Sequence, residues 1–227
     1  MLERVHERLL GLDATYQSEL ILIDDGSGDE TAAVLAAFAR RFPQTRVLTH
    51  DCNRGLVEAL KTGIGAAGGE AVVVLDADLS YAPDIVEPLV RTLFERRADV
   101  VIASPYMRGG HVGNVPLDRL VASRCANWLL SALVGGRIKT FTGMVRAYDG
   151  ATIRALAGRE IAGEFNAGVL AAILRERGSI VEIPAALVWP RSRTDAPSRM
   201  TPATLWRRFQ LIIQTAQVLS MSIRGAR

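Results

Sequence analysis

Short apolar runs alternate with longer amphipathic stretches along the first half of the chain. The short runs are rich in β-branched residues and end in turn residues, which is typical of buried strands. The longer stretches carry apolar residues at helical spacing, and some begin with acidic residues that suit a helix N-terminus. The pattern predicts strands at residues 19–24, 45–50, 71–78 and 99–104, and helices at residues 2–12, 29–42, 55–67 and 83–96. This alternation indicates an α/β fold with a mostly parallel sheet flanked by helices.

The second half is less regular. Its pattern predicts a glycine-rich loop at 108–116, helices at 117–136 and 163–178, a strand at 180–189, a loop containing arginines at 190–202 and a final helix at 203–227. No repeat, low-complexity tract or linker separates these elements. We therefore expect one domain over residues 1–203, followed by a C-terminal amphipathic helix over residues 204–227.

Composition adds a contrast in charge between the two halves of the chain. The apolar share of 49% and the charged share of 22% are ordinary for a globular protein. Residues 1–105 hold 10 Lys and Arg against 17 Asp and Glu, whereas residues 106–227 hold 17 against 7. An acidic half and a basic half suggest that one holds a cation and the other an anion. Chance asymmetry in solvated faces is the alternative.

Two predicted strands end in paired acids. Asp24 and Asp25 follow "LILI", and Asp76-Ala77-Asp78 follows "VVVL". Ligands of parallel sheets bind at the carboxyl ends of the strands, so both acidic ends are expected on the functional edge. If the chain stays extended there, Asp76 and Asp78 point the same way and can share Mg²⁺ or Mn²⁺. Solvated turns are the alternative interpretation.

The ordered motifs resemble a known family. The segments "ILIDDGSGDET" and "NRGLVEALKTGIGAAGGEAVVVLDADLSYAPDIVEPLV" look like glycosyltransferase family 2, and most like its dolichyl- or polyprenyl-phosphate mannose synthases. Later stretches agree in order: "ASPYMRGGHVGNVPLDRLVAS", "FTGMVRAY" and "EFNAGVLAAILRERGSIVEIPAALVWPRSR". The resemblance covers about residues 19–200. It implies a nucleotide-diphospho-sugar transferase fold of the GT-A type, in which the usual first strand is missing here.

The resemblance also implies the donor site. Asp24 or Asp25 would hydrogen-bond the base or ribose of a nucleotide sugar. Asp76 and Asp78 would hold Mg²⁺ or Mn²⁺ on its diphosphate, with Ala77 between them in the same site. The resemblance implies transfer of a hexose, mannose or glucose, from the nucleotide sugar to a polyprenyl or dolichyl phosphate, with inversion at the anomeric carbon.

Acceptor residues are implied in the same way. Arg119 and Ser123, one helical turn apart, and Arg193 match positions that contact the acceptor phosphate. Asp78, Arg119 and Arg193 are the expected catalytic residues. The attacking phosphate oxygen is already anionic, so no histidine base is needed, and His6, His50 and His111 are expected to form no constellation. Two positions depart from the family pattern: Pro105 replaces an arginine, and Thr140 replaces an acid.

The membrane is the last expected partner. Apolar residues at helical spacing form one stripe in the final helix: Leu205, Phe209, Ile212, Ile213, Ala216, Leu219 and Ile223. Trp206 lies beside the stripe, and arginines bracket it. We expect this helix to lie on an anionic membrane, with core packing as the alternative. The expected location is cytoplasmic, on the inner face of the membrane, with no nucleic-acid partner. Two cysteines without metal spacing fit a reducing compartment.

Three other functions stay open. The same fold can act on a sugar acceptor in solution, and a chain without its first strand can be a non-catalytic nucleotide-binding remnant. A receiver-like signalling domain also has an acidic pair and a later aspartate. Against it, Lys139 is the only lysine after Lys61 and does not follow a clear strand.

Overall fold

The computed structural model describes residues 2–12, 15–161, 165–189, 210, 212–217 and 219–220. The chain divides into two compact units. Unit 1 comprises residues 1–72 and 150–160, and unit 2 comprises residues 73–149 and 161–227. Both units are assembled from separate stretches of sequence. The predicted boundary at residues 203/204 lies outside the described residues.

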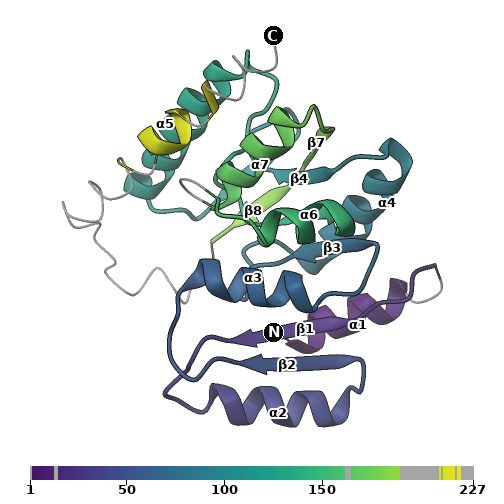
Figure 1. The fold of residues 1–227 in the computed structure, drawn as a ribbon. Helices are drawn as coiled ribbons and strands as arrows, with labels where there is room; N and C mark the ends of the chain where they lie inside the picture. The colour runs from purple at the N-terminus through teal and green to yellow at the C-terminus, as the bar shows by residue number, and fades with distance from the viewer. Residues whose placement is uncertain are drawn as a thin grey trace. The chain divides into compact units, whose positions relative to one another are not determined.

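Unit 1 is built on two parallel strands. Its elements are α1 (Leu2–Leu12), β1 (Leu20–Asp24), α2 (Thr31–Arg41), β2 (Thr45–Thr49), α3 (Leu56–Ala66) and α6 (Gly150–Ala157), as Figure 1 shows. Strands β1 and β2 pair in register from Leu20 opposite Thr45 to Asp24 opposite Thr49. Helix α2 packs on both strands and α3 packs on β1. The apolar run of β1 is therefore covered by helices, and its two acids come at the strand end.

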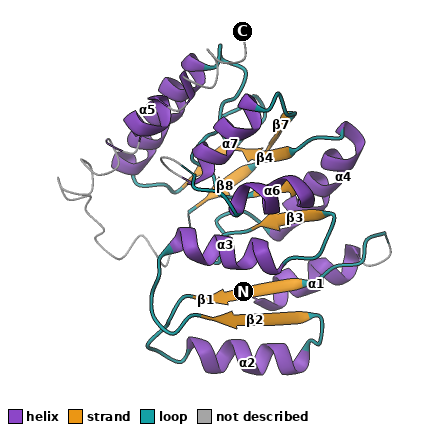
Figure 2. Cartoon of the chain, viewed as in Figure 1, coloured by secondary structure: helices purple, strands orange, loops and turns teal. Residues whose placement is uncertain are grey.

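Unit 2 holds the main sheet. Its elements are a 3₁₀ turn (Pro83–Ile85), α4 (Val86–Arg96), β4 (Val100–Ser104), β5 (His111–Gly113), α5 (Leu117–Leu133), β6 (Arg146–Asp149), α7 (Phe165–Arg175), β7 (Ile180–Pro184) and β8 (Ala186–Val188), coloured by type in Figure 2. Strand β3 (Ala71–Val74) begins in unit 1 and ends in unit 2. The sheet order is β3-β6-β4-β7, and β5 pairs with β8 separately.

Strand β4 is the centre of the unit 2 core. All five of its residues are buried, as the unbroken run "VVIAS" predicts for a strand covered on both faces. It pairs parallel with β7 and antiparallel with β6, so the sheet is mixed. Helix α4 packs on β4 and β6 and buries Leu89 and Leu93.

Among the described residues the predicted helices and strands are present with shifted ends, except that the strand expected at 180–189 is two strands, β7 and β8, in different sheets. Three further elements were not predicted. β5 lies inside the expected glycine-rich loop, and β6 and α6 had no prediction. β6 reads Arg-Ala-Tyr-Asp, which has no apolar run, although Arg146 is fully buried in it. In the predicted C-terminal helix, residues 210, 212–217 and 219–220 are described and helical. Within the described part of the chain, no helix combines the length and apolar character that a membrane crossing requires.

Candidate functional site

The turn after β1 positions two carboxylates. Strand β1 ends at Asp24, and Asp25 and Gly26 follow it. Gly26 has a φ of 71°, in the left-handed region. A Cβ atom there would lie 2.4 Å from the carbonyl carbon of Cys52, so the two backbones meet closely. Only glycine fits this point, and it sets where the two preceding acids lie.

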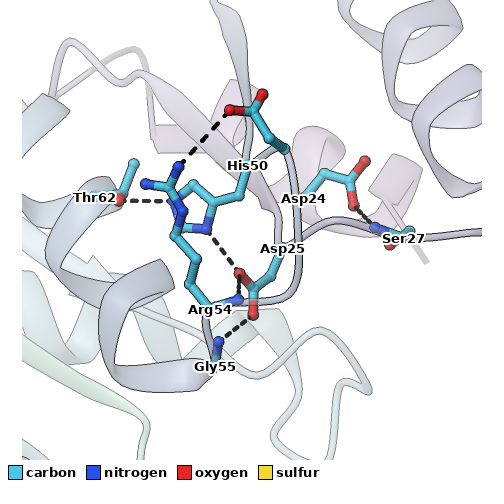
Figure 3. Close-up of polar contacts among 8 residues, drawn as sticks. Asp24, Asp25, Ser27, His50, Arg54, Gly55 and Thr62 are labelled. Carbon is cyan, nitrogen blue, oxygen red and sulfur yellow. Dashed lines mark hydrogen bonds and ion pairs between the residues drawn. The ribbon is translucent and has the colours of Figure 1, made fainter.

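Asp25 binds the segment that leads from β2 to α3 (Figure 3). Its Oδ1 accepts hydrogen bonds from Nδ1 of His50 at 2.7 Å and from the backbone N–H of Arg54 at 2.9 Å. Its Oδ2 accepts from the backbone N–H of Gly55 at 2.8 Å. The Arg54 N–H and then the His50 side chain lower the pKa of Asp25 below its usual value of 3.8. Asp25 therefore acts as an anchor for residues 50–55.

His50 connects Asp25 to α3. The imidazole is buried, and its Nε2 lies 2.9 Å from Oγ1 of Thr62. Because a carboxylate only accepts, Nδ1 donates to Asp25, and in the neutral ring Nε2 accepts from the Thr62 hydroxyl. The expectation that the histidines form no constellation was therefore wrong for His50. Parallel pairing places Asp24 opposite Thr49, so the next residues, Asp25 and His50, meet at one strand end.

Asp24 is held differently. Its Oδ1 accepts from the backbone N–H of Ser27 at 3.0 Å, and its side chain turns to the opposite side of the loop from Asp25 (Figure 3). The residue is 2% exposed, and among the described residues its Oδ2 has no hydrogen-bond partner. A buried carboxylate oxygen without a donor is costly. This atom is suited to accept from an N–H or O–H group of a ligand.

The second acidic end forms a turn in unit 2. Strand β3 ends at Val74, and the backbone N–H of Leu79 donates to the carbonyl of Asp76 at 3.2 Å. Oδ1 of Asp78 accepts from the backbone N–H of Ser80 at 2.9 Å. The chain therefore turns at Ala77 and Asp78, so the extended backbone on which the shared orientation of Asp76 and Asp78 depended is not present, and the alternative of a turn holds. The side chains of Asp76 and Asp78 are half-buried, so solvent still reaches them, and Ala77 is exposed.

These two carboxylates fit a hard divalent cation by the chemistry of their oxygens. Among the described residues, no group of three or more His, Cys, Asp and Glu side chains is arranged to hold a metal ion. A Mg²⁺ or Mn²⁺ held by one or two carboxylates completes its coordination with water and substrate phosphates. Asp76 and Asp78 are compatible with that pattern.

Two of the three predicted acceptor residues, Arg119 and Ser123, lie on α5. The Arg119 guanidinium carbon lies 5.0 Å from the centre of the Trp189 ring. Oγ of Ser123 accepts from the Tyr106 hydroxyl at 2.8 Å. The two side chains thus have different neighbours, although they are one turn apart. Arg193 lies outside the described residues.

Sequence reasoning missed two side chains that position the segment at residues 139–142. Asn127 donates from Nδ2 to Oγ1 of Thr142 at 3.0 Å and accepts at Oδ1 from the N–H of Phe141 at 2.6 Å. Glu182 accepts from the N–H groups of Lys139 and Thr140 at 2.7 and 2.9 Å. A buried asparagine on a helix and an acid in a strand were the available signals. Thr140, noted as a departure from the family pattern, is buried and bonds the Ser104 hydroxyl at 2.7 Å.

Comparison with curated proteins gives two informative relatives. The chain is 30% identical over 138 residues to a dolichol-phosphate mannosyltransferase from Pyrococcus furiosus, covering 61% of this chain and 36% of the relative. It is 36% identical over 139 residues to a polyprenol monophosphomannose synthase from Mycolicibacterium smegmatis, covering 60% and 52%. The match thus spans about a third to a half of the length of these relatives.

Solved structures share the fold. Glucosyl-3-phosphoglycerate synthase from Mycobacterium tuberculosis, in complex with Mn²⁺, uridine diphosphate and phosphoglyceric acid, matches with a TM-score of 0.64 and 20% identity. The match covers 94% of this chain and 73% of that one. The expected α/β fold of the GT-A type, with mostly parallel strands flanked by helices, is therefore confirmed. The family model described as glycosyl transferase family 2 matches residues 1–158. The chain belongs to glycosyltransferase family 2.

Proposed function

We propose that this chain transfers a hexose from a nucleoside-diphosphate sugar to a polyprenyl or dolichyl phosphate at an anionic membrane surface. Family membership supports glycosyl transfer, and the two mannose synthase relatives support the lipid phosphate. The observation that supports binding of the nucleotide sugar is the buried Oδ2 of Asp24, which has no hydrogen-bond partner among the described residues. An imide N–H of a base or a ribose hydroxyl supplies that donor.

Two roles follow for the acids after β1. Asp24 contacts the nucleoside, because its Oδ2 has no hydrogen-bond donor among the described residues. Asp25 positions the segment at residues 50–55, because both of its oxygens already accept hydrogen bonds. The sequence left either acid as the nucleoside contact, and this geometry favours Asp24.

The reaction is a displacement at the anomeric carbon. An acceptor phosphate oxygen forms the new bond, the bond to the donor diphosphate breaks, and the nucleoside diphosphate leaves with that electron pair. The nucleophile carries its own negative charge, so no base has to take a proton. Orienting the reactants and neutralising their charge then supply the rate. Inversion at the anomeric carbon is the expected outcome.

Charge neutralisation is assigned to two groups of side chains. Asp76 and Asp78 would hold Mg²⁺ or Mn²⁺, which when bound supplies positive charge to the leaving diphosphate. Arg119 and Arg193 would donate to the acceptor phosphate, since a guanidinium matches phosphate geometry with two parallel hydrogen bonds. Ser123 supplies a hydroxyl on the same helix as Arg119.

The donor side is tested by calorimetry with uridine and guanosine diphosphates in the presence of Mn²⁺. Asp24→Asn should weaken binding of the preferred nucleotide by about tenfold, roughly 1.4 kcal/mol, because the charged acceptor is lost. Asp29→Asn is the matched control: it removes the same charge from the same loop, at an exposed side chain. Equal affinity in the wild type and Asp24→Asn would refute the nucleoside contact.

The acceptor side is tested by transfer of radiolabelled hexose to polyprenyl phosphate in detergent, with phosphoglyceric acid and free sugars as competitors. The lipid phosphate should be the preferred acceptor, and Arg119→Ala should lower its use with nucleotide affinity unchanged. Preference for phosphoglyceric acid would instead favour the function named for the M. tuberculosis structure. Nucleotide binding without transfer to any acceptor would favour the non-catalytic remnant.

A further inference from the structure

Helix α5 presents an apolar stripe to solvent. Leu117, Val121 and Trp128 are 78%, 58% and 73% exposed, and Cys125 and Ala132 between and beyond them are exposed as well. At 100° per residue these positions lie on one face of the helix. The opposite face is the one that packs, because it carries the buried residues Ala126, Asn127, Leu130 and Ser131. Folding of unit 2 therefore does not explain why the outer face is apolar.

An exposed tryptophan in a continuous apolar stripe marks a binding surface. From Leu117 to Ala132 the stripe extends about 22 Å, at a rise of roughly 1.5 Å per residue. Leu129 and Leu133 are also partly exposed and widen it at the C-terminal end. The stripe is long and narrow, as expected of a helix that lies flat on an apolar layer.

Charge around the stripe selects its partner. Arg124 is exposed at the edge of the stripe, and Arg137 and Lys139 are exposed just beyond the end of the helix. Asp118 is the only acid on α5. A second copy of the chain, docked about a two-fold axis, would bring these like charges together. Tryptophan and arginine beside apolar side chains instead match the boundary between lipid headgroups and acyl chains.

We propose that the outer face of α5 (Leu117, Val121, Arg124, Trp128 and Ala132) lies on an anionic membrane. The proposal rests on the lipid acceptor proposed above and adds the surface that meets the bilayer. Arg119 and Ser123 are on the far side of the same helix from the stripe. A helix is about 10–12 Å across, so the proposed phosphate contacts stand within that distance of the lipid headgroups.

The test is co-sedimentation of the full chain with vesicles of phosphatidylcholine, with and without phosphatidylglycerol. The double variant Val121→Ser/Trp128→Ser should bind the anionic vesicles about tenfold more weakly than the wild type. The matched control is Val34→Ser/Val57→Ser, which removes exposed apolar side chains from α2 and α3 and should bind like the wild type. All substituted positions are exposed, and calorimetric nucleotide binding checks that each variant is folded.

Charge reversal provides an independent arm. Arg124→Glu should weaken binding to anionic vesicles and reduce its salt sensitivity, because a cation near the surface is lost. Arg96→Glu makes the same change in net charge at an exposed position of α4, and should have a smaller effect. A larger effect of Arg96→Glu than of Arg124→Glu would contradict the assignment of this face.

Two results would overturn the proposal. One is vesicle binding by Val121→Ser/Trp128→Ser that equals the wild type. The other is a wild-type dimer, seen by light scattering, that Trp128→Ser dissociates while the wild type ignores vesicles at every salt concentration. A different result would show that the proposed function is wrong and the membrane surface right. In that case vesicle binding would depend on α5, but polyprenyl phosphate would not be glycosylated in detergent.

Discussion

Two strand ends in this chain have almost the same sequence pattern and different local structures. After β1 in unit 1, Asp25 accepts three hydrogen bonds and Asp24 is buried. After β3 in unit 2, Asp76 and Asp78 are half-buried, and they lie in a turn. The fold holds both acids of the first pair and leaves one oxygen of Asp24 without a donor among the described residues, whereas the second pair is more open to solvent. An acidic pair at a strand end thus indicates a site, but neighbouring backbone decides which acids hold the fold and which meet a ligand.

The largest effect on the turn after β1 is expected from a substitution at Gly26. Gly26→Ala should lower the free energy of unfolding by at least about 2 kcal/mol and the melting temperature by roughly 5 °C. The added Cβ would meet the Cys52–Asn53 backbone at a left-handed φ, so the acidic turn and the adjacent segment cannot both keep their places. Thermal unfolding followed by circular dichroism measures the effect.

Gly28→Ala is the control for that prediction, because a Cβ at Gly28 meets nothing within 4 Å. It should unfold within about 0.5 kcal/mol of the wild type. Similar stability of the two variants would mean that the turn after β1 is not rigidly held, and the contrast between the two acidic ends would disappear.

The accessible pair is expected to respond in ligand binding and not in stability. Asp76→Asn and Asp78→Asn should each weaken Mn²⁺-dependent binding of a nucleoside diphosphate about tenfold, roughly 1.4 kcal/mol, since each removes a charged oxygen ligand. Their unfolding free energies should stay within about 0.5 kcal/mol of the wild type. Calorimetry with and without Mn²⁺ separates the two readouts. A large stability loss with unchanged affinity would make this turn a structural one.

Some elements of the fold and the site could be predicted from the sequence, and others could not. Short, mostly apolar runs located β1, β2, β3 and β4, and every residue of β4 is buried, as its unbroken run predicts. They could not locate β6, whose Arg146 is buried through bonds to the carbonyls of Phe141 and Asn166. The role of His50 depended on the register of β1 against β2, which no local pattern states. The sequence left an extended segment and a turn open at Asp76 to Asp78, and the backbone bond from the Leu79 N–H to the Asp76 carbonyl decides for the turn.

A smaller effect is expected at the hydroxyl behind His50. Thr62→Val leaves the buried Nε2 of His50 without its partner and should lower the free energy of unfolding by about 1 kcal/mol. Thr62→Ser keeps the hydroxyl and should retain most of that stability. Urea denaturation distinguishes the variants. If valine and serine are equivalent, the contact between Nε2 and the hydroxyl contributes nothing, and Asp25 is held by backbone N–H groups alone.

The smallest expected effect is the acid dependence of Asp25. Its pKa lies below 3.8 in the folded chain, first because of the Arg54 N–H and then because of His50. A lowered folded pKa means that the ionised carboxylate stabilises the fold above its unfolded pKa, and that this contribution disappears as the pH falls through the folded pKa. The wild type should therefore lose stability from about pH 4 downward more steeply than Asp25→Asn, which has no carboxylate to protonate. Asp51→Asn removes an equal charge from an exposed side chain of the neighbouring segment and serves as the control. Urea denaturation across this pH range measures the slopes. Parallel curves for the wild type and Asp25→Asn would show that Asp25 is no better held than an acid in solvent, and would remove the difference between the two acidic ends.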